Sequence, residues 1–367
     1  MARYDCDARS LTRRQALTVI GGYAGVAALV PDVLAQKKLA FPKGSIIRTL
    51  FKDVPPEAIG GPILFHEHLS IDLPPNLNPR PADAPPPPTP QPPATANVDL
   101  IVEEVKAAAR DGVRCIVDGG HPDMKRNLEK LKTIANRTDV LVVASGGYYM
   151  ERVYPPDLAT QTDDQIAEGL VREANANRYG AFGEIGENAD AAMSDLERKV
   201  FRAVGKAHRA TNLPIFTHNA YGTGPNVPKD AGLHQLDVLE SVGVKPERIA
   251  VGHTCCLDDP RGEVIKAIAR RGAFVGFDRV TAGRVPDEGK IKALLVFLDA
   301  GYADRLLLSS DSTGARTLDA PAYDRTTSGF VPKLRAAGIK NETIQSILID
   351  NPRRFLAFVP KKSTQRH

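Results

Sequence analysis

The feature that most constrains the fold is a repeated alternation of short apolar runs with longer segments of helical periodicity. The apolarity of these runs is continuous rather than alternating, which is typical of strands buried on both faces of a parallel sheet. Eight such strand–helix units in succession predict an α/β fold, a single (β/α)8 TIM barrel, with a doubly wound open sheet as the second choice. The runs occupy residues 62–68, 114–120, 140–147, 179–186, 213–219, 248–254, 273–279 and 305–311.

Two of the intervening segments carry recognisable helix-end signals. Residues 99–112 place apolar side chains at helical spacing and end in Gly112, an expected C-cap. Residues 194–211 show the same spacing and begin at Ser194, an expected N-capping residue.

The two ends of the chain are expected to lie outside the barrel. Residues 1–35 place Arg13 and Arg14 before a weakly apolar run and a small residue, Ala35, which is the order of a twin-arginine signal peptide. The run is too short and too rich in Gly and Ala for a transmembrane helix, and an amphipathic helix is the alternative. The sequence thus predicts a periplasmic or secreted protein, a barrel over residues 36–360 and a disordered tail at 361–367.

The proline-rich segment at residues 80–94 can form neither a helix interior nor a sheet. It follows the first predicted strand and precedes the first predicted helix, so we expect a semi-rigid loop on the C-terminal face of the barrel. A linker between domains is the alternative interpretation.

Composition excludes several classes of protein. A formal charge of +4 over 367 residues, without a basic cluster, argues against a nucleic-acid partner. Four cysteines are too few for a disulfide framework, and Cys115 lies in an apolar run where it is expected to be core.

Potential metal ligands gather at the ends of the predicted strands. One histidine at the end of a strand is more often a core residue than a ligand. A whole set at the C-terminal ends, where barrel enzymes keep their catalytic residues, predicts a metal centre. The set comprises His66, His68, Glu184, His218, His253 and Asp311.

The chemistry of this set favours two divalent cations. Imidazoles and carboxylates suit Zn²⁺, and also Co²⁺ or Mn²⁺. The set exceeds the ligands that one catalytic zinc usually takes, so we expect Glu184 to bridge two ions, with Glu187 as an alternative. Such a pair would activate a bridging hydroxide, and Asp311 would be the catalytic proton acceptor. A non-catalytic periplasmic metal-binding barrel or scaffold is the rival hypothesis.

These residues and their surroundings resemble the phosphotriesterase-related family of the amidohydrolase superfamily, in particular its homology-protein and lactonase branches. The likeness covers residues 45–358 and rests on G-P-I-L-F-H-E-H-L, F-T-H, R-I-A-V-G-H, R-G-A-F-V-G-F-D-R, L-L-L-S-S-D and D-N-P-R-R-F. It implies a binuclear centre in which a glutamate replaces the carboxylated lysine of many members, in agreement with Glu184. The implied substrate is a small-molecule lactone, carboxylic ester or organophosphate triester, with no nucleic-acid or membrane partner after export.

The resemblance also implies residues around the metals. Arg279 and Tyr148 are expected to line the substrate pocket, although Tyr148 and Tyr149 are not separable by sequence. Many members have an acidic proton-relay residue where this chain has Cys255 and Cys256. A homodimer is a further expectation.

Overall fold

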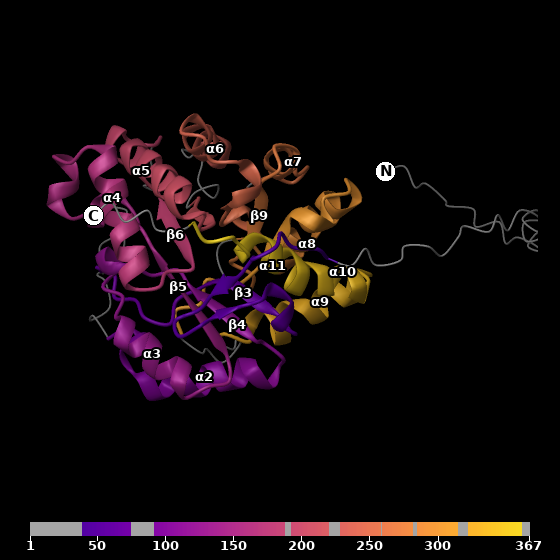
Figure 1. The fold of residues 1–367 in the computed structure, drawn as a ribbon. Coiled ribbons are helices and arrows are strands. Elements are labelled where there is room, and N and C mark those ends of the chain that lie inside the picture. Colours follow the sequence, from indigo (N-terminus) through magenta and orange to yellow (C-terminus); the bar gives the residue numbers. More distant parts are fainter. Residues whose placement is uncertain are drawn as a thin grey trace, which may run out of the picture. The chain divides into compact units, whose positions relative to one another are not determined.

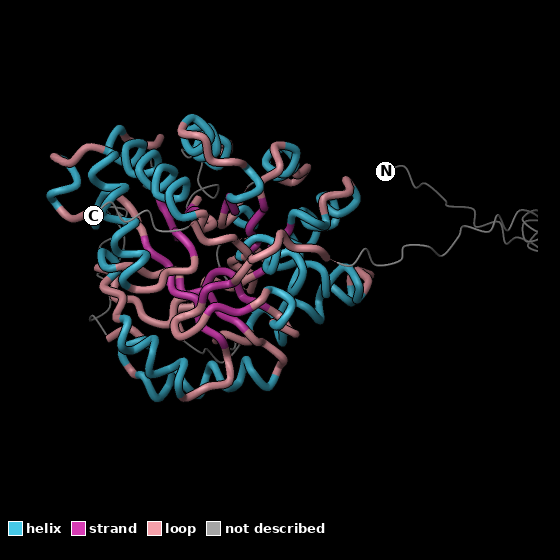
Figure 2. Tube along the Cα trace, in the orientation of Figure 1, coloured by secondary structure: helices cyan, strands magenta, loops and turns pink. Residues whose placement is uncertain are grey.

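The structure is a computed structural model that describes residues 39–74, 92–187, 192–219, 228–257, 259–281, 285–314 and 322–361. The predicted signal peptide, residues 80–91 of the proline-rich segment and residues 362–367 of the tail lie outside the described residues. The described chain confirms the predicted barrel: parallel strands gather at the centre and helices surround them (Figures 1 and 2).

The central sheet has eight strands, each hydrogen-bonded to its sequence neighbours in parallel, in the order β3 to β10. Every predicted apolar run contains one of them. They are β3(Ile63–Glu67), β4(Cys115–Asp118), β5(Leu141–Gly146), β6(Ala181–Gly186), β7(Ile215–His218), β8(Ile249–Val251), β9(Phe274–Phe277) and β10(Leu306–Leu308). A separate antiparallel hairpin, β1(Ile47–Arg48) and β2(Asp53–Val54), precedes the barrel.

Helices follow the strands as the periodicity predicts. Ser194 caps its helix through a reciprocal capping box with Glu197, and Gly112 lies just past its helix at φ 96°, a left-handed value that favours glycine. The helices are α2(Val98–Arg110), α3(Leu128–Asn136), α4(Asp163–Ala176), α5(Asp195–Thr211), α6(Ala231–Ser241), α7(Glu263–Arg270), α8(Asp287–Asp299), α9(Val331–Ala336), α10(Asn341–Gln345) and α11(Asn351–Leu356). Two π-helical segments, η9(Arg325–Phe330) and η10(Ser346–Asp350), precede α9 and α11.

The apolar core has two main parts on opposite faces of the sheet. One fills the barrel, where Phe65 packs edge-on against Phe216 and Phe355, and it includes Cys115, which is fully buried as predicted. The larger part lies between the strands and the helices. Continuous apolarity along each strand is the sequence signature of this burial on both faces.

Side chains join the first and last strands of the sheet. Glu67 of β3 accepts hydrogen bonds from Ser309 Oγ (2.8 Å), Ser310 N (2.8 Å) and Ser312 N (2.6 Å), all in the segment after β10. Two backbone bonds cross the same gap, from His68 N to Ser312 O (2.9 Å) and from Asp311 N to His66 O (3.2 Å). We call this junction the seam; it holds the end of β3 against the segment that carries Asp311.

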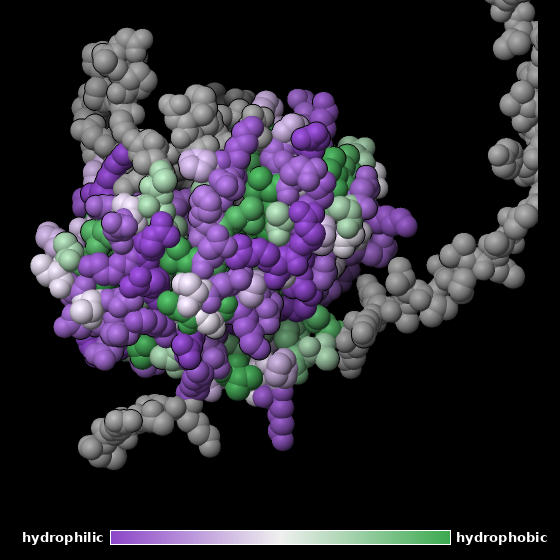
Figure 3. All heavy atoms as spheres, turned by 90° about the horizontal axis from the view of Figure 1, so that it is seen from above, coloured by the Kyte–Doolittle hydropathy of each residue, from purple (hydrophilic) through white to green (hydrophobic). Residues whose placement is uncertain are grey.

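The surface is mainly hydrophilic on the face seen in Figure 3, with hydrophobic residues scattered between charged ones. Among the described residues, no helix combines the length and apolarity needed to cross a lipid bilayer.

Candidate metal centre

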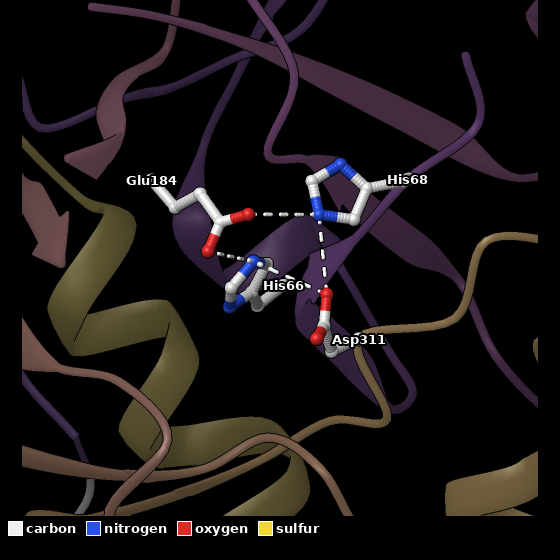
Figure 4. A group of neighbouring side chains, drawn as sticks. All are labelled: His66, His68, Glu184 and Asp311. Carbon is white, nitrogen blue, oxygen red and sulfur yellow. Dashed lines mark ion pairs between the residues drawn. The ribbon is translucent and has the colours of Figure 1, made fainter. Parts of the chain in front are cut away.

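The structure brings all the predicted ligands to one end of the barrel. His66 belongs to β3, Glu184 to β6 and His218 to β7, whereas His68, His253 and Asp311 lie just past β3, β8 and β10. Five of them are at most 5 % exposed, and the Asp311 side chain is 15 % exposed. A group of four of these side chains converges in Figure 4.

Glu184 lies at the centre of the cluster. Its Oε1 is 3.1 Å from His68 Nε2. Its Oε2 is 2.7 Å from His218 Nδ1, 3.3 Å from His66 Nε2 and 3.4 Å from His253 Nε2. One carboxylate therefore contacts all four imidazoles, which is the placement required of a bridging ligand.

Asp311 faces the opposite side of the first histidine pair. Its Oδ1 is 3.1 Å from His68 Nε2 and 3.7 Å from His66 Nε2. The potential ligand atoms consequently form two overlapping groups that share Glu184: His66, His68, Glu184 and Asp311 in one, and Glu184, His218 and His253 in the other.

The arrangement fits a pair of divalent cations. His66 Nε2 points into the cluster, is buried and has no hydrogen-bond partner, which is costly for a polar atom unless a cation occupies that side. His218 Nδ1 and His253 Nε2 are 2.8 Å apart, so two imidazole nitrogens aim at nearly the same place. Neutral imidazoles and carboxylates in this number suit Zn²⁺ and related ions.

Electrostatics inside the cluster keep the carboxylates ionised. Burial raises the pKa of Glu184, but the charges of His218 and His66 outweigh it and hold that pKa well below its ordinary value. Burial likewise opposes ionisation of Asp311, and the hydrogen bond from His68 with the charge of His253 lowers its pKa. Both side chains are therefore available as anionic ligands.

Asp278, which sequence reasoning missed, orients two of the histidines. It directly follows β9, is fully buried, and accepts from His66 Nδ1 (2.8 Å), His253 Nδ1 (3.0 Å) and His253 N (2.6 Å). With Nδ1 of each ring bound to this carboxylate, Nε2 of each ring faces Glu184. Asp278 lies in the motif G-F-D-R, immediately before Arg279.

His121 and Asp123 position Glu184 from behind. His121 Nε2 donates to the Glu184 carbonyl oxygen (3.0 Å), and its Nδ1 is 2.6 Å from Asp123 Oδ1. His121 is fully buried, so its hydrogen bond to the Glu184 backbone is shielded from solvent.

Arg279 and a tyrosine lie at the edge of the cluster. Arg279 Nε is 3.4 Å from Asp311 Oδ2, so the guanidinium forms an ion pair with a predicted ligand. Of the two neighbouring tyrosines, Tyr149 places its hydroxyl 3.2 Å from His218 Nε2, whereas the Tyr148 ring packs against Tyr154. Tyr149, and not Tyr148, therefore contacts a predicted ligand, because alternate residues of an extended segment point in opposite directions.

Glu187, the alternative bridge, belongs to none of the ligand groups that the described residues form. It is 4 % exposed, and burial with the charge of Glu197 raises its pKa to about 8. Its carboxyl group is therefore protonated at neutral pH, which makes it a poor bridge between cations.

A barrel with this cluster at the C-terminal ends of its strands defines the class of barrel metallohydrolases. Within that class, the chain belongs to the phosphotriesterase family, whose model matches residues 49–356. Members of this family hold a pair of divalent metal ions, in line with the two overlapping ligand groups.

Three known proteins illustrate the relationship. The chain is 31 % identical over 312 residues to the phosphotriesterase homology protein of Escherichia coli, covering 80 % of this chain and 97 % of that protein. A crystal structure of the E. coli homology protein, complexed with phosphate in its active site, has a TM-score of 0.69 at 29 % identity and covers 81 % of this chain and 99 % of that one.

The other two relatives carry names of different hydrolases. An aryldialkylphosphatase of Saccharolobus solfataricus is 28 % identical over 276 residues, covering 70 % of this chain and 84 % of that protein. An N-acetyltaurine hydrolase of Xenopus tropicalis is 25 % identical over 283 residues, covering 71 % and 78 %. The relatives thus span bonds to phosphorus and an amide, so family membership alone leaves the substrate bond open.

Proposed function

We propose that this protein is an exported, metal-dependent hydrolase that cleaves an ester-type bond of a small molecule, preferably a lactone or carboxylic ester. The observation that carries the proposal is the sharing of Glu184 by two ligand groups, with Asp311 and Arg279 at the open edge. His66, His68, Glu184 and Asp311 would hold one cation, and Glu184, His218 and His253 the other. Two such cations would polarise the scissile carbonyl or phosphoryl group and lower the pKa of a water molecule.

The proton transfers fall to Asp311. Its pKa is lowered, so it is ionised and able to accept a proton from the attacking water and return it to the leaving oxygen. Arg279 contacts the outer oxygen of Asp311 and holds it in orientation. The Tyr149 hydroxyl beside His218 is placed to donate to the substrate.

The residues at the position of the family's proton relay favour an ester over an amide as the substrate. An amine leaves only when protonated, whereas an alkoxide or phenoxide leaves with less assistance. In this chain Cys255 and Cys256 occupy the positions where many members, by resemblance, carry an acidic relay residue. The N-acetyltaurine hydrolase relatives support amide hydrolysis as the second candidate function.

The test is a substrate panel on metal-reconstituted protein, with lactones, aryl esters, phosphotriesters and N-acetylated amines. We expect about two metals per chain and hydrolysis that disappears on chelation. Turnover of the acetylated amine alone would replace the ester proposal by the amide one. Metal without turnover of any of these compounds would favour the non-catalytic scaffold.

A pair of matched variants tests the bridge. Glu184→Gln should lose at least one metal and most of its activity. Glu187→Gln is the control, because Glu187 is buried, already neutral at pH 7 and three residues away. A Glu184→Gln protein that kept both metals and full turnover would disprove the bridging role.

A further inference from the structure

A cavity of about 330 Å³ lies between the segment after β8 and helix α8. Its walls include the apolar side chains of Leu257, Ile265 and Val285. An apolar protein cavity of about 150 Å³ is enough to hold benzene, so this one has room for a small organic ligand. None of the predicted metal ligands lines it.

Two adjacent thiols line the cavity. Cys255 and Cys256 belong to the short 3-10 turn η7(Thr254–Cys256), and neither forms a disulfide. The side chains of Cys255 and Cys256 hydrogen-bond to each other, so the two sulfurs lie close together.

The same cavity is connected to the catalytic edge through the backbone of Arg279. Cys255 Sγ accepts a hydrogen bond from Arg279 N (3.3 Å), and Lys290 Nζ donates to Arg279 O (2.6 Å). Both Cys255 and Lys290 line the cavity, whereas the Arg279 guanidinium faces Asp311 on the other side. A ligand that draws the Cys255 sulfur away from Arg279 N would therefore break one of these two hydrogen bonds to the Arg279 backbone.

We propose that Cys255 and Cys256 form a dithiol site for trivalent thiophilic metalloids of the arsenous class, and that occupation of this site inhibits the enzyme by displacing Arg279. Thiol ligands favour soft acceptors such as trivalent arsenic, whereas the metal centre offers only imidazoles and carboxylates. Adjacent cysteines present two sulfurs to one atom, which a single thiol cannot do.

The reaction of the two thiols with an organoarsenous oxide needs no oxidant or reductant. An organoarsenous oxide loses its oxygen and gains two arsenic–sulfur bonds. The two thiol protons leave with that oxygen as one water molecule, and no oxidation state changes. The organic group would occupy the apolar part of the cavity.

The test uses phenylarsine oxide on the full-length, metal-loaded protein under native conditions. We expect one adduct per chain by intact mass, retained during gel filtration in excess monothiol and released by a dithiol. Cys256→Ser and Cys255→Ser should each lose retention, because one thiol remains. Cys115→Ser is the control and should retain the adduct, since Cys115 is fully buried in β4 and burial raises its pKa to about 12.

Binding and coupling are measured separately. Capture does not depend on the proposed hydrolase function, whereas the inhibition does. With any substrate from the panel, we expect the adduct to lower turnover at least tenfold at unchanged metal content. Retention in both single-cysteine variants, or no adduct on the wild-type protein, would overturn the site; an adduct with full turnover would overturn the coupling.

Discussion

Replacing Asp278 by Asn is expected to weaken metal binding without unfolding the barrel. Asp278 accepts from Nδ1 of both His66 and His253, and from His253 N. An amide has one accepting oxygen. If it keeps the two bonds to His253, its NH₂ group meets His66 Nδ1, which must then accept, and the ring proton moves to Nε2. A protonated Nε2 cannot bind a cation.

The magnitude follows from the loss of one orienting partner. Removing such a partner of a ligating histidine typically costs ten- to a hundredfold in metal affinity, or about 1.4 to 3 kcal/mol. The fully buried position of Asp278 places the effect toward the upper end, because solvent cannot supply a substitute acceptor. The assay is competition with a chromophoric chelator, together with elemental analysis of metal per chain.

Asp259→Asn provides the matched control for this prediction. The Asp259 carboxylate also accepts several hydrogen bonds, from the backbone N–H groups of Glu263 (2.8 Å), Val264 (2.8 Å) and Ile265 (3.3 Å) at the start of α7. It belongs to none of the ligand groups. The reasoning is refuted if Asp278→Asn binds both cations within twofold of wild type, or if Asp259→Asn weakens metal binding equally.

Three further outcomes follow from the contacts described. Glu67→Gln removes the acceptor opposite the Ser312 N–H and should lower the free energy of unfolding in urea by about 2 kcal/mol; a loss below about 0.5 kcal/mol would contradict this. Burial lowers the pKa of His208 from 6.5 to about 4, so the His208 imidazole binds a proton more tightly in the unfolded chain than in the folded protein. The free energy of unfolding should then fall by about 3 kcal/mol as pH drops from 6.5 to 4. His208→Asn, compared at matched metal content, should abolish that part of the loss. If the variant showed the same loss of stability in acid as the wild type, His208 would not be its source. Tyr149→Phe should lower kcat/KM about three- to tenfold while Tyr148→Phe leaves it unchanged, given one hydrogen bond of ordinary strength; an unchanged kcat/KM in Tyr149→Phe would contradict this prediction.

The fold was predictable because the strands are buried on both faces. Continuous apolar runs such as 62–68 and 248–254 locate the strands, and the ligand positions follow because parallel strands end at one edge. His66 and Asp311 are distant in sequence, yet both lie at the ends of such runs. The barrel topology alone therefore places His66 and Asp311 near each other.

The residues that sequence reasoning missed act through contacts that no spacing reveals. Asp278 matters because its two oxygens reach histidines from β3 and from the segment after β8 at once. Tyr149 differs from Tyr148 only by which side of the chain it faces, and the run S-G-G-Y-Y has no periodicity that fixes this. The raised pKa of Glu187 depends on its burial and on the charge of Glu197, a residue of helix α5.

The seam explains why the metal centre and the closure of the barrel depend on each other. Glu67 anchors the segment after β10 to β3, and its neighbours on either side, His66 and His68, are predicted ligands. Asp311 lies between Ser310 and Ser312, which both donate backbone hydrogen bonds to Glu67. A cation held by His68 and Asp311 would thus cross-link the same two segments that Glu67 joins by hydrogen bonds. Because folding already holds these ligand positions together, metal binding loses less conformational entropy. This preorganisation is the physical advantage of alternating ligands and anchors in H-E-H and S-S-D-S.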